Sequence, residues 1–297
     1  MDYPIHIYDT ATVGKPVICL AHGNGFPPEM YIPLIRAIGS DYHSVCLPSR
    51  PWWENSNPDA FTGWEMLADD LIAGIKAHDL APVIGIGHSM GGVAMMIAAV
   101  RQPELFHSVI MLDPVFMPRF WLRFIRIAKP FGYRPLKQLI NRALKRQRQW
   151  NSLEDAYQRF RQRSLFARCS DEVVCLYVEG MTRPSENGIA LAYLPEWEAA
   201  IFSHIPLYEW RYPLKLTVPA LIIGGAKSDT FLSPAIKLWR RMRPDIRVEI
   251  ISESGHLVPM EEPDTVAGYI CAFLNQSADK RRGRFSAIRR HDTFAHS

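Results

Sequence analysis

The chain has 297 residues, of which 48% are hydrophobic and 22% charged, with a net charge of +4. This balance is typical of a globular protein with a sizeable core and argues against a disordered chain. No run approaches the roughly 18 apolar residues of a membrane-spanning helix. The N-terminus lacks the basic start and apolar run of a signal peptide. The five cysteines include no C-x-x-C pair and indicate neither a disulfide framework nor a zinc site. We therefore expect a soluble, cytoplasmic protein.

Short runs rich in valine, isoleucine and leucine alternate along the chain with segments of helical periodicity. The expected elements are strands at 17–21, 44–48, 83–87, 109–113, 220–224 and 247–252, helices at 64–78, 90–101, 234–242 and 263–275, and an antiparallel strand at 5–8. Apolar strands alternating with helices are typical of a mostly parallel sheet that is covered on both faces. The sequence therefore predicts an α/β core formed by residues 1–114 and 214–276.

This alternation stops between residues 115 and 213, a stretch without a convincing strand. Its apolar residues recur at helical spacing, which predicts amphipathic helices that break near Pro130 to Pro135 and a further helix within 198–210. We interpret residues 115–213 as a helical cap inserted into the core. The segment 116–168 holds fourteen Lys and Arg against two acidic residues. Residues 277–297 are also basic and are expected to form a poorly ordered tail.

The most specific motif is Gly87-His88-Ser89-Met90-Gly91, a G-x-S-x-G sequence between an expected strand and an expected helix. A serine on so tight a turn adopts a strained backbone, and glycines two positions away let the strand and helix approach. We therefore predict that Ser89 is a nucleophile. The amide of Met90, at the start of the helix, is the expected oxyanion donor. An ordinary turn serine is the alternative, which the flanking strand and helix disfavour.

With these motifs the chain resembles the α/β-hydrolase superfamily. The resemblance is strongest in Leu20-Ala-His-Gly-Asn-Gly-Phe-Pro27, Gly87-His-Ser-Met-Gly-Gly92 and Ser254-Gly-His-Leu-Val-Pro-Met-Glu-Glu-Pro263, and it extends over nearly all the chain except the cap and tail. It implies a serine hydrolase that cleaves a carboxylic ester, thioester or lactone through an acyl-enzyme. Haloperoxidases and C–C bond hydrolases are also relatives of this kind, so the fold defines the machinery better than the substrate.

A serine hydroxyl needs an adjacent base that a third group holds in the right tautomer. His256 follows the last expected strand, at the carboxyl edge of the sheet where Ser89 also lies, and is the expected base. Both Asp113 and Asp229 follow strands at this edge. The resemblance favours Asp229 as the acid, because it matches the commoner placement in the superfamily, and leaves Asp113 as the alternative.

The glycine-rich segment His22 to Pro27 should form the other wall of the site. We assign the second oxyanion donor to the Asn24 amide, with Gly25 and Phe26 as alternatives, because an added glycine shifts the register relative to a simpler His-Gly-x-Pro pattern. Aromatic side chains are expected around an apolar acyl pocket. The predicted substrate-binding residues are Phe26, His88, Trp52, Trp53 and Phe116.

The chemistry predicted here needs no metal and no organic cofactor, and its partner is a small-molecule acyl substrate. The basic run of the cap is most simply a solvated helix face. Its functional alternatives are attraction of an anionic substrate or acyl carrier, or association with an acidic membrane surface. No nucleic-acid recognition motif is present. The competing hypotheses are perhydrolase or C–C hydrolase chemistry with the same residues, and a silent binding protein, which the intact Ser, Asp and His set argues against.

Overall fold

The computed structural model describes residues 3–9 and 14–276. Its centre is a seven-stranded sheet of order β1-β3-β2-β4-β5-β9-β10. The strands are β1 (His6–Ile7), β2 (Val17–Ala21), β3 (His43–Cys46), β4 (Val83–His88), β5 (Phe106–Leu112), β9 (Ala220–Gly225) and β10 (Arg247–Ile251). Neighbouring strands run parallel, except for the antiparallel pair β1 and β3. The predicted α/β class and the antiparallel first strand are both confirmed.

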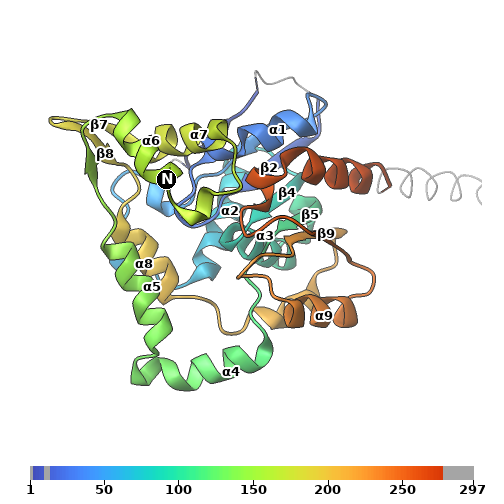
Figure 1. Ribbon diagram of the computed structural model, residues 1–297. Coiled ribbons are helices and arrows are strands. Elements are labelled where there is room, and N and C mark those ends of the chain that lie inside the picture. The colour runs from blue at the N-terminus through green and yellow to red at the C-terminus, as the bar shows by residue number, and fades with distance from the viewer. Residues whose placement is uncertain (1–2, 10–13, 277–297) are drawn as a thin grey trace, which may run out of the picture.

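The core helices are α1 (Ile32–Ile38), α2 (Trp64–Ala77), α3 (Met90–Arg101), α9 (Ser233–Met242), α10 (Val258–Glu261) and a helical stretch at 263–276. α3 follows the central strand β4 and is buried along Met90 to Ala99, because it lies between the sheet and α2. In Figure 1, α1 lies beside the C-terminal helix, where the Cys271 thiol contacts the Ile38 carbonyl. Helices thus pack on the sheet as the alternating sequence pattern predicts.

Short 3-10 helices occupy many of the connections. They are η1 (Pro28–Tyr31), η2 (Arg50–Trp52), η3 (Pro58–Ala60), η4 (Pro103–Leu105), η5 (Lys129–Phe131), η6 (Ser164–Phe166), η7 (Glu209–Arg211) and η8 (Pro213–Lys215). Most begin with proline at their first or second position, where the missing N–H is not needed.

The cap lies between β5 and β9 and is mostly helical. Its helices are α4 (Arg119–Ala128), α5 (Arg134–Leu144), α6 (Leu153–Arg161), α7 (Asp171–Met181) and α8 (Pro195–Ser203). The chain turns between α4 and α5 at η5 and Gly132, whose φ is +80°, so the break expected near Pro130 to Pro135 is present. α5 packs along α8, and Figure 1 shows this pair standing to one side of the sheet.

The expectation that the cap contains no strand is wrong. β6 (Gln149–Trp150), β7 (Thr182–Ser185) and β8 (Gly188–Leu191) form a small antiparallel sheet of order β6-β8-β7. These strands have two to four residues, too few for an alternating pattern to emerge in the sequence. The Asn187-Gly188 dipeptide was the available turn signal. Gly188 has a φ of +109°, and a Cβ there would lie 2.4 Å from the Trp150 carbonyl oxygen.

The basic tail predicted at 277–297 lies outside the described residues. Within 3–9 and 14–276, no helix is both long and apolar enough to cross a membrane.

Candidate active site

Ser89 lies on a sharp turn between β4 and α3, as the G-x-S-x-G motif predicts. Its φ and ψ are 55° and −118°, a conformation that L-residues rarely adopt. The glycines on either side are required by contact. A Cβ on Gly87 would lie 2.4 Å from the Gly91 carbonyl oxygen, and one on Gly91 would lie 2.2 Å from that of Ala21. The turn therefore brings the serine to the carboxyl edge of the sheet.

Three side chains form a hydrogen-bonded chain at this edge. The Ser89 Oγ lies 3.0 Å from Nε2 of His256, and Nδ1 of the same ring lies 2.7 Å from Oδ2 of Asp113. A carboxylate can only accept, so Nδ1 carries the proton and Nε2 is left to accept from the serine hydroxyl. The structure thus pairs Ser89 with His256 as predicted, and pairs His256 with Asp113.

Asp113, the alternative acid, takes the place beside His256 that the sequence analysis assigned to Asp229. Asp113 directly follows β5, the strand next to β4, and its side chain is fully buried. Its Oδ1 accepts from the Gly225 amide at 3.0 Å and its Oδ2 from the Ser228 hydroxyl at 2.5 Å. The carboxylate is therefore held by the last residue of β9 and by the loop that follows it.

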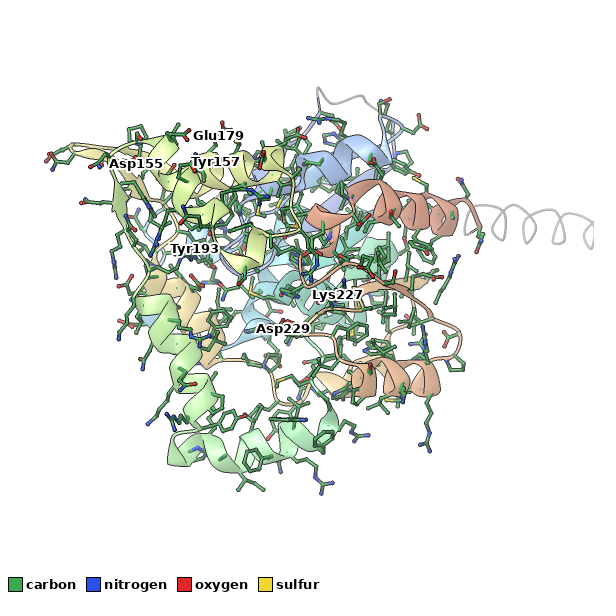
Figure 2. The ribbon with its side chains drawn as sticks, viewed as in Figure 1. Asp155, Tyr157, Glu179, Tyr193, Lys227 and Asp229 are labelled. Atoms are coloured by element: carbon green, nitrogen blue, oxygen red, sulfur yellow. The ribbon has the colours of Figure 1, made fainter. Side chains whose placement is uncertain are left out.

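Asp229 lies outside this network. The loop turns Ser228 toward Asp113, since the Ser228 Oγ also accepts from the amides of Thr230 and Phe231 at 3.0 and 3.2 Å. The next residue, Asp229, is exposed and accepts from the Thr230 hydroxyl. Figure 2 shows Asp229 near Lys227 on this loop. The loop after β9 thus presents Ser228 to the Asp113 carboxylate and leaves Asp229 on the outside.

The loop that carries His256 is tied down by Glu261 in α10. This carboxylate accepts from the Ser254 hydroxyl at 2.7 Å and from the Gly255 amide at 2.5 Å. The His256 carbonyl accepts from Nε2 of His88 at 2.9 Å. Both contacts hold the backbone on either side of the His256 ring, so the ring has a defined position against Ser89.

His88, predicted to bind substrate, is instead a buried structural residue with no exposed surface. Its Nδ1 accepts from the Tyr31 hydroxyl at 2.8 Å, and that hydroxyl accepts from the Gly23 amide at 2.9 Å. Burial lowers the pKa of His88 to about 3, so the ring is neutral. It therefore links three segments through hydrogen bonds of fixed direction: the Gly23 loop, the His256 loop and the turn at residues 87–91, which we call the elbow.

His22 has a similar structural role. Its Nδ1 donates to the Gly23 carbonyl at 2.8 Å, while its Nε2 accepts from the Ser49 amide at 2.9 Å. Burial lowers the pKa of this imidazole to about 4. A neutral ring can donate and accept at once, so His22 ties the loop after β2 to the loop after β3.

Two backbone amides border the site where an oxyanion would form. Met90 is the first residue of α3, and its amide has no acceptor within the helix. Among the described residues, the Asn24 amide makes no backbone hydrogen bond, whereas the Phe26 amide donates to the Gly23 carbonyl. The Asn24 side chain is fixed, since its Nδ2 donates to the Glu198 carbonyl and its Oδ1 accepts from Tyr193. Of the three amides considered, Phe26 is thereby engaged elsewhere.

A cavity of about 650 Å³ opens beside Ser89 and His256. Phe26 lines it, as expected, together with apolar side chains from the cap. These are Val115, Met117, Leu139, Ala143, Leu165, Phe166, Phe202 and Ile205. The volume falls within the usual range for small-molecule sites, about 300–1,000 Å³.

The other predicted aromatic residues do not line this cavity. Phe116 has no exposed surface and packs edge-on against Trp210 and Trp239 in the core. Trp52 packs on Tyr193, and Trp53 packs on Tyr3 and donates to the Pro48 carbonyl. Aromatic residues near a strand end thus served packing here, because large apolar side chains gain most from burial in the core.

The cavity also holds charged side chains, among them arginines of the basic run in the cap. Arg142, Arg146 and Arg163 line it, together with Glu198 and Asp229. The Arg146 guanidinium donates to Glu198 at 2.5 Å and to the Tyr177 hydroxyl. Arg146 also lies close to Gly25, since a Cβ there would be 3.3 Å from its Nη1. This pair therefore covers the loop that carries the candidate oxyanion amide. No sequence motif marked it, because its partners are 52 residues apart.

The chain and its fold match known proteins. The model of the alpha/beta hydrolase family matches residues 17–268. The 2-(acetamidomethylene)succinate hydrolase of Mesorhizobium japonicum is 23% identical over 265 residues, which cover 88% of each chain. A crystal structure of E-2-(acetamidomethylene)succinate hydrolase is similar with a TM-score of 0.73, at 18% identity, over 91% of this chain and 94% of that one. The crystal structure of the enol-lactonase from Burkholderia xenovorans LB400 is similar with a TM-score of 0.65, at 17% identity, over 92% of this chain and 96% of that one.

This chain belongs to the alpha/beta hydrolase family. It is an enzyme of the hydrolase type, and its core has the mostly parallel sheet and flanking helices of its solved neighbours.

Proposed function

We propose that this protein is a serine hydrolase that cleaves a carboxylic ester, thioester or lactone through an acyl-enzyme intermediate. The observation that carries the proposal is the hydrogen-bonded chain from Ser89 through His256 to Asp113 beside a largely apolar cavity. A serine, a base and an orienting acid in this order form the constellation that activates a hydroxyl for acyl transfer.

In this mechanism, Ser89 attacks the substrate carbonyl while Nε2 of His256 takes its proton. The buried Asp113 carboxylate stabilises the imidazolium that forms. Collapse of the tetrahedral intermediate releases the alcohol or thiol, which takes the proton from His256. Water then attacks the acyl-enzyme with the same ring as base, and the carboxylic acid product leaves Ser89 free. For a lactone, the released hydroxyl and acid remain in one molecule.

The developing oxyanion would accept from the amides of Met90 and Asn24. An amide at the start of a helix adds the favourable field of the helix dipole to its own hydrogen bond. Loss of one oxyanion donor commonly lowers kcat by about 10²–10³. Rigid tethering of Asn24 through Glu198 and Tyr193 supports this assignment, since a preorganised donor need not reorient during the reaction.

The volume and the mostly apolar lining of the cavity favour a small or medium acyl group that is apolar along most of its length. The three arginines that line the cavity favour a second kind of substrate, one that carries a carboxylate on its acyl group or its leaving group. Guanidinium groups recognise carboxylates through paired hydrogen bonds. The name of one relative specifies a succinate derivative, which bears such groups. We therefore rank short esters, amides or lactones with a carboxylate as the second substrate class.

The test is labelling with a fluorophosphonate probe, followed by mass spectrometry, alongside a panel of p-nitrophenyl esters, acyl-CoA thioesters and lactones. We expect a single adduct on Ser89 and ester hydrolysis that Ser89→Ala reduces by about 10⁶ in kcat. Unchanged turnover in Ser89→Ala would overturn the proposal. Peracid formation from a short acid and hydrogen peroxide, faster than hydrolysis of any ester, would favour the perhydrolase alternative.

A further inference from the structure

Helix α4 presents large apolar side chains to the outside of the protein. Phe120, Phe124 and Ile127 are 62%, 56% and 69% exposed, and Trp121 beside them is 43% exposed. The spacing of the first three places them on one face of the helix. Leu122 and Ile125, on the opposite side, are buried and attach α4 to the rest of the protein. On the outward face, Phe124 packs edge-on against Tyr133, but more than half of each of the three side chains remains exposed.

A row of positive charge runs beside this apolar face. Arg119, Arg123 and Arg126 recur at the same helical spacing, and all three are exposed. Residues 119–144, which span α4 and α5, contain seven Lys and Arg and no Asp or Glu. Within the described chain no ion pair involves Arg119, Arg123 or Arg126, although Arg126 stacks over Tyr208. The face thus combines aromatic and aliphatic surface with uncompensated positive charge.

The position of α4 favours contact with a large surface. Figure 1 shows α4 at the lower edge of the molecule, outside the layers that the sheet and its helices form. Ile125 and Lys129 at α4 line a second cavity of about 160 Å³. Met117, Leu139 and Ile205 line both this cavity and the larger one beside Ser89. Apolar side chains therefore continue from the inner side of α4 to the candidate active site.

We propose that α4 is an interfacial helix that docks this protein onto a lipid bilayer with anionic headgroups. An amphipathic helix with aromatic and aliphatic residues on one face and arginines beside it lies in the interface, its apolar side chains among the acyl chains and its cations among the headgroups. The proposal does not depend on the hydrolase chemistry. It adds that an acyl substrate would reach the cavity from the side that faces the bilayer.

Charge favours an anionic bilayer over two other partners for α4, a second copy of the chain and the segment 277–297. A second copy of the chain would bring two rows of arginines together, which like-charge repulsion opposes. The segment 277–297, with six Lys and Arg against two Asp, carries the same sign as α4 and is a poor complement to it. An anionic bilayer satisfies both faces of the helix at once, because it offers negative headgroups directly above hydrocarbon.

The first experiment is flotation of the full-length protein with vesicles of phosphatidylcholine alone or mixed with phosphatidylglycerol. We expect binding to the mixed vesicles that weakens at high salt, since exposed charges are screened. The variant Phe120→Ser/Phe124→Ser/Ile127→Ser should bind on the order of tenfold or more weakly, because it removes the inserted apolar surface. A control, Leu153→Ser/Leu194→Ser/Leu214→Ser, removes three exposed leucines outside α4 and should bind like wild type.

A second pair of variants isolates the charge. Arg119→Gln/Arg123→Gln/Arg126→Gln should abolish the preference for phosphatidylglycerol. Lys76→Gln/Lys237→Gln/Arg241→Gln makes the same change in net charge at exposed positions of other helices and should retain it. If the tail 277–297 were the lipid-binding part, the α4 variant and the control variant would bind alike. That result would overturn the assignment to α4.

Fluorescence quenching and sedimentation velocity provide two further tests of the proposal. Vesicles with brominated acyl chains should quench the emission of Trp121, and Trp121→Phe should remove that quenching while binding persists. Sedimentation velocity without lipid should give the same molecular mass for wild type and the Phe120, Phe124 and Ile127 variant. Absence of vesicle binding, or a wild-type dimer that this variant converts to a monomer, would overturn the proposal. Neither readout requires hydrolysis, so its failure is separate from failure of the proposed function.

Discussion

Asp113 combines an unusual backbone with a fully satisfied carboxylate. Its φ is 40°, and its two oxygens accept from Gly225, Ser228 and His256. Positive φ is costly for a residue other than glycine, and such conformations persist where surrounding contacts hold them. The conformation turns the side chain from the end of β5 toward His256. Residue-level geometry therefore favours Asp113 as the orienting acid.

Asp113→Asn should reduce kcat for ester hydrolysis by about 10⁴, because an amide cannot hold His256 in the reactive tautomer as a carboxylate does. Asp229→Asn is the matched control and should change kcat little, since Asp229 is exposed and bonded to Thr230. Steady-state kinetics on purified variants would measure both, with thermal melts to verify folding. A large loss in Asp229→Asn alone would restore Asp229 as the acid.

The cavity arginines allow a test of substrate charge at the same scale. Arg142→Ala/Arg163→Ala should raise KM for an ester with a carboxylate on its acyl group more than KM for the neutral ester of equal length, because Arg142 and Arg163 line the cavity. Arg146 is left intact, since its pairing with Glu198 is buried and its loss would disturb Gly25.

The control for this test is Lys145→Ala/Arg159→Ala, which removes two exposed charges outside the cavity. An equal rise of KM for both esters in the cavity variant would refute anion recognition. If the cavity variant and the control variant raised KM for the charged ester equally, the arginines would act only through long-range electrostatic steering.

The elbow is the element on which the site depends. β2, β4 and α3 approach so closely at Gly91 that a methyl group there would overlap the Ala21 backbone. The contact is with main-chain atoms at the end of β2, which cannot move without shifting the strand. Both the nucleophile and the loop that carries Asn24 would shift with it.

Gly91→Ala should lower the free energy of unfolding by about 1–3 kcal/mol or more, as overpacking does in a dense core. Gly268→Ala is its control, because Gly268 is helical and a Cβ there meets no atom within 4 Å. That variant should gain about 0.4–1 kcal/mol. Urea unfolding measures both. Equal stability of the two variants would contradict the close packing of the elbow.

At the scale of the whole molecule, the cap and core meet at a buried carboxyl group. Glu209 in η7 is 1% exposed at the point where the chain returns from the cap, and neighbouring Trp210 donates to the carbonyl of Met117 at the start of the cap. Burial raises the pKa of Glu209 to about 8, against opposing hydrogen bonds with its own backbone and that of Met117.

This shift makes stability depend on pH with a definite sign. Between its unfolded pKa, near 4.5, and about 8, the folded state holds a proton at Glu209 that the unfolded state has lost. The free energy of unfolding therefore falls as pH rises through this window. Glu209→Gln removes that fall, so the stability of the variant relative to wild type should rise from about pH 5 to 8 and level off by about pH 9.

Urea unfolding across that range, in both proteins, gives the difference directly. His22 and His88, whose lowered pKa values act in the opposite direction at acid pH, are common to both proteins and cancel. A constant difference between the two proteins across the range would show that Glu209 titrates normally.

The sequence alone determined the alternating core, the positions of its parallel strands and the glycine-flanked turn that carries Ser89. These follow from local signals, because strand and helix periods and a glycine-flanked serine act over a few residues. The break between α4 and α5 was equally local, since proline and glycine cannot continue a helix there.

Only the tertiary structure decided which aspartate faces His256, since Asp113 and Asp229 both follow strands at one sheet edge and the orientation of Ser228 separates them. It also decided that Phe116, Trp52 and Trp53 pack away from the cavity, and that Arg146 pairs with Glu198. These outcomes depend on contacts between residues far apart in the chain. Periodicity and motifs indicate the secondary structure of each segment. The direction in which a side chain points depends on how the segments pack against one another.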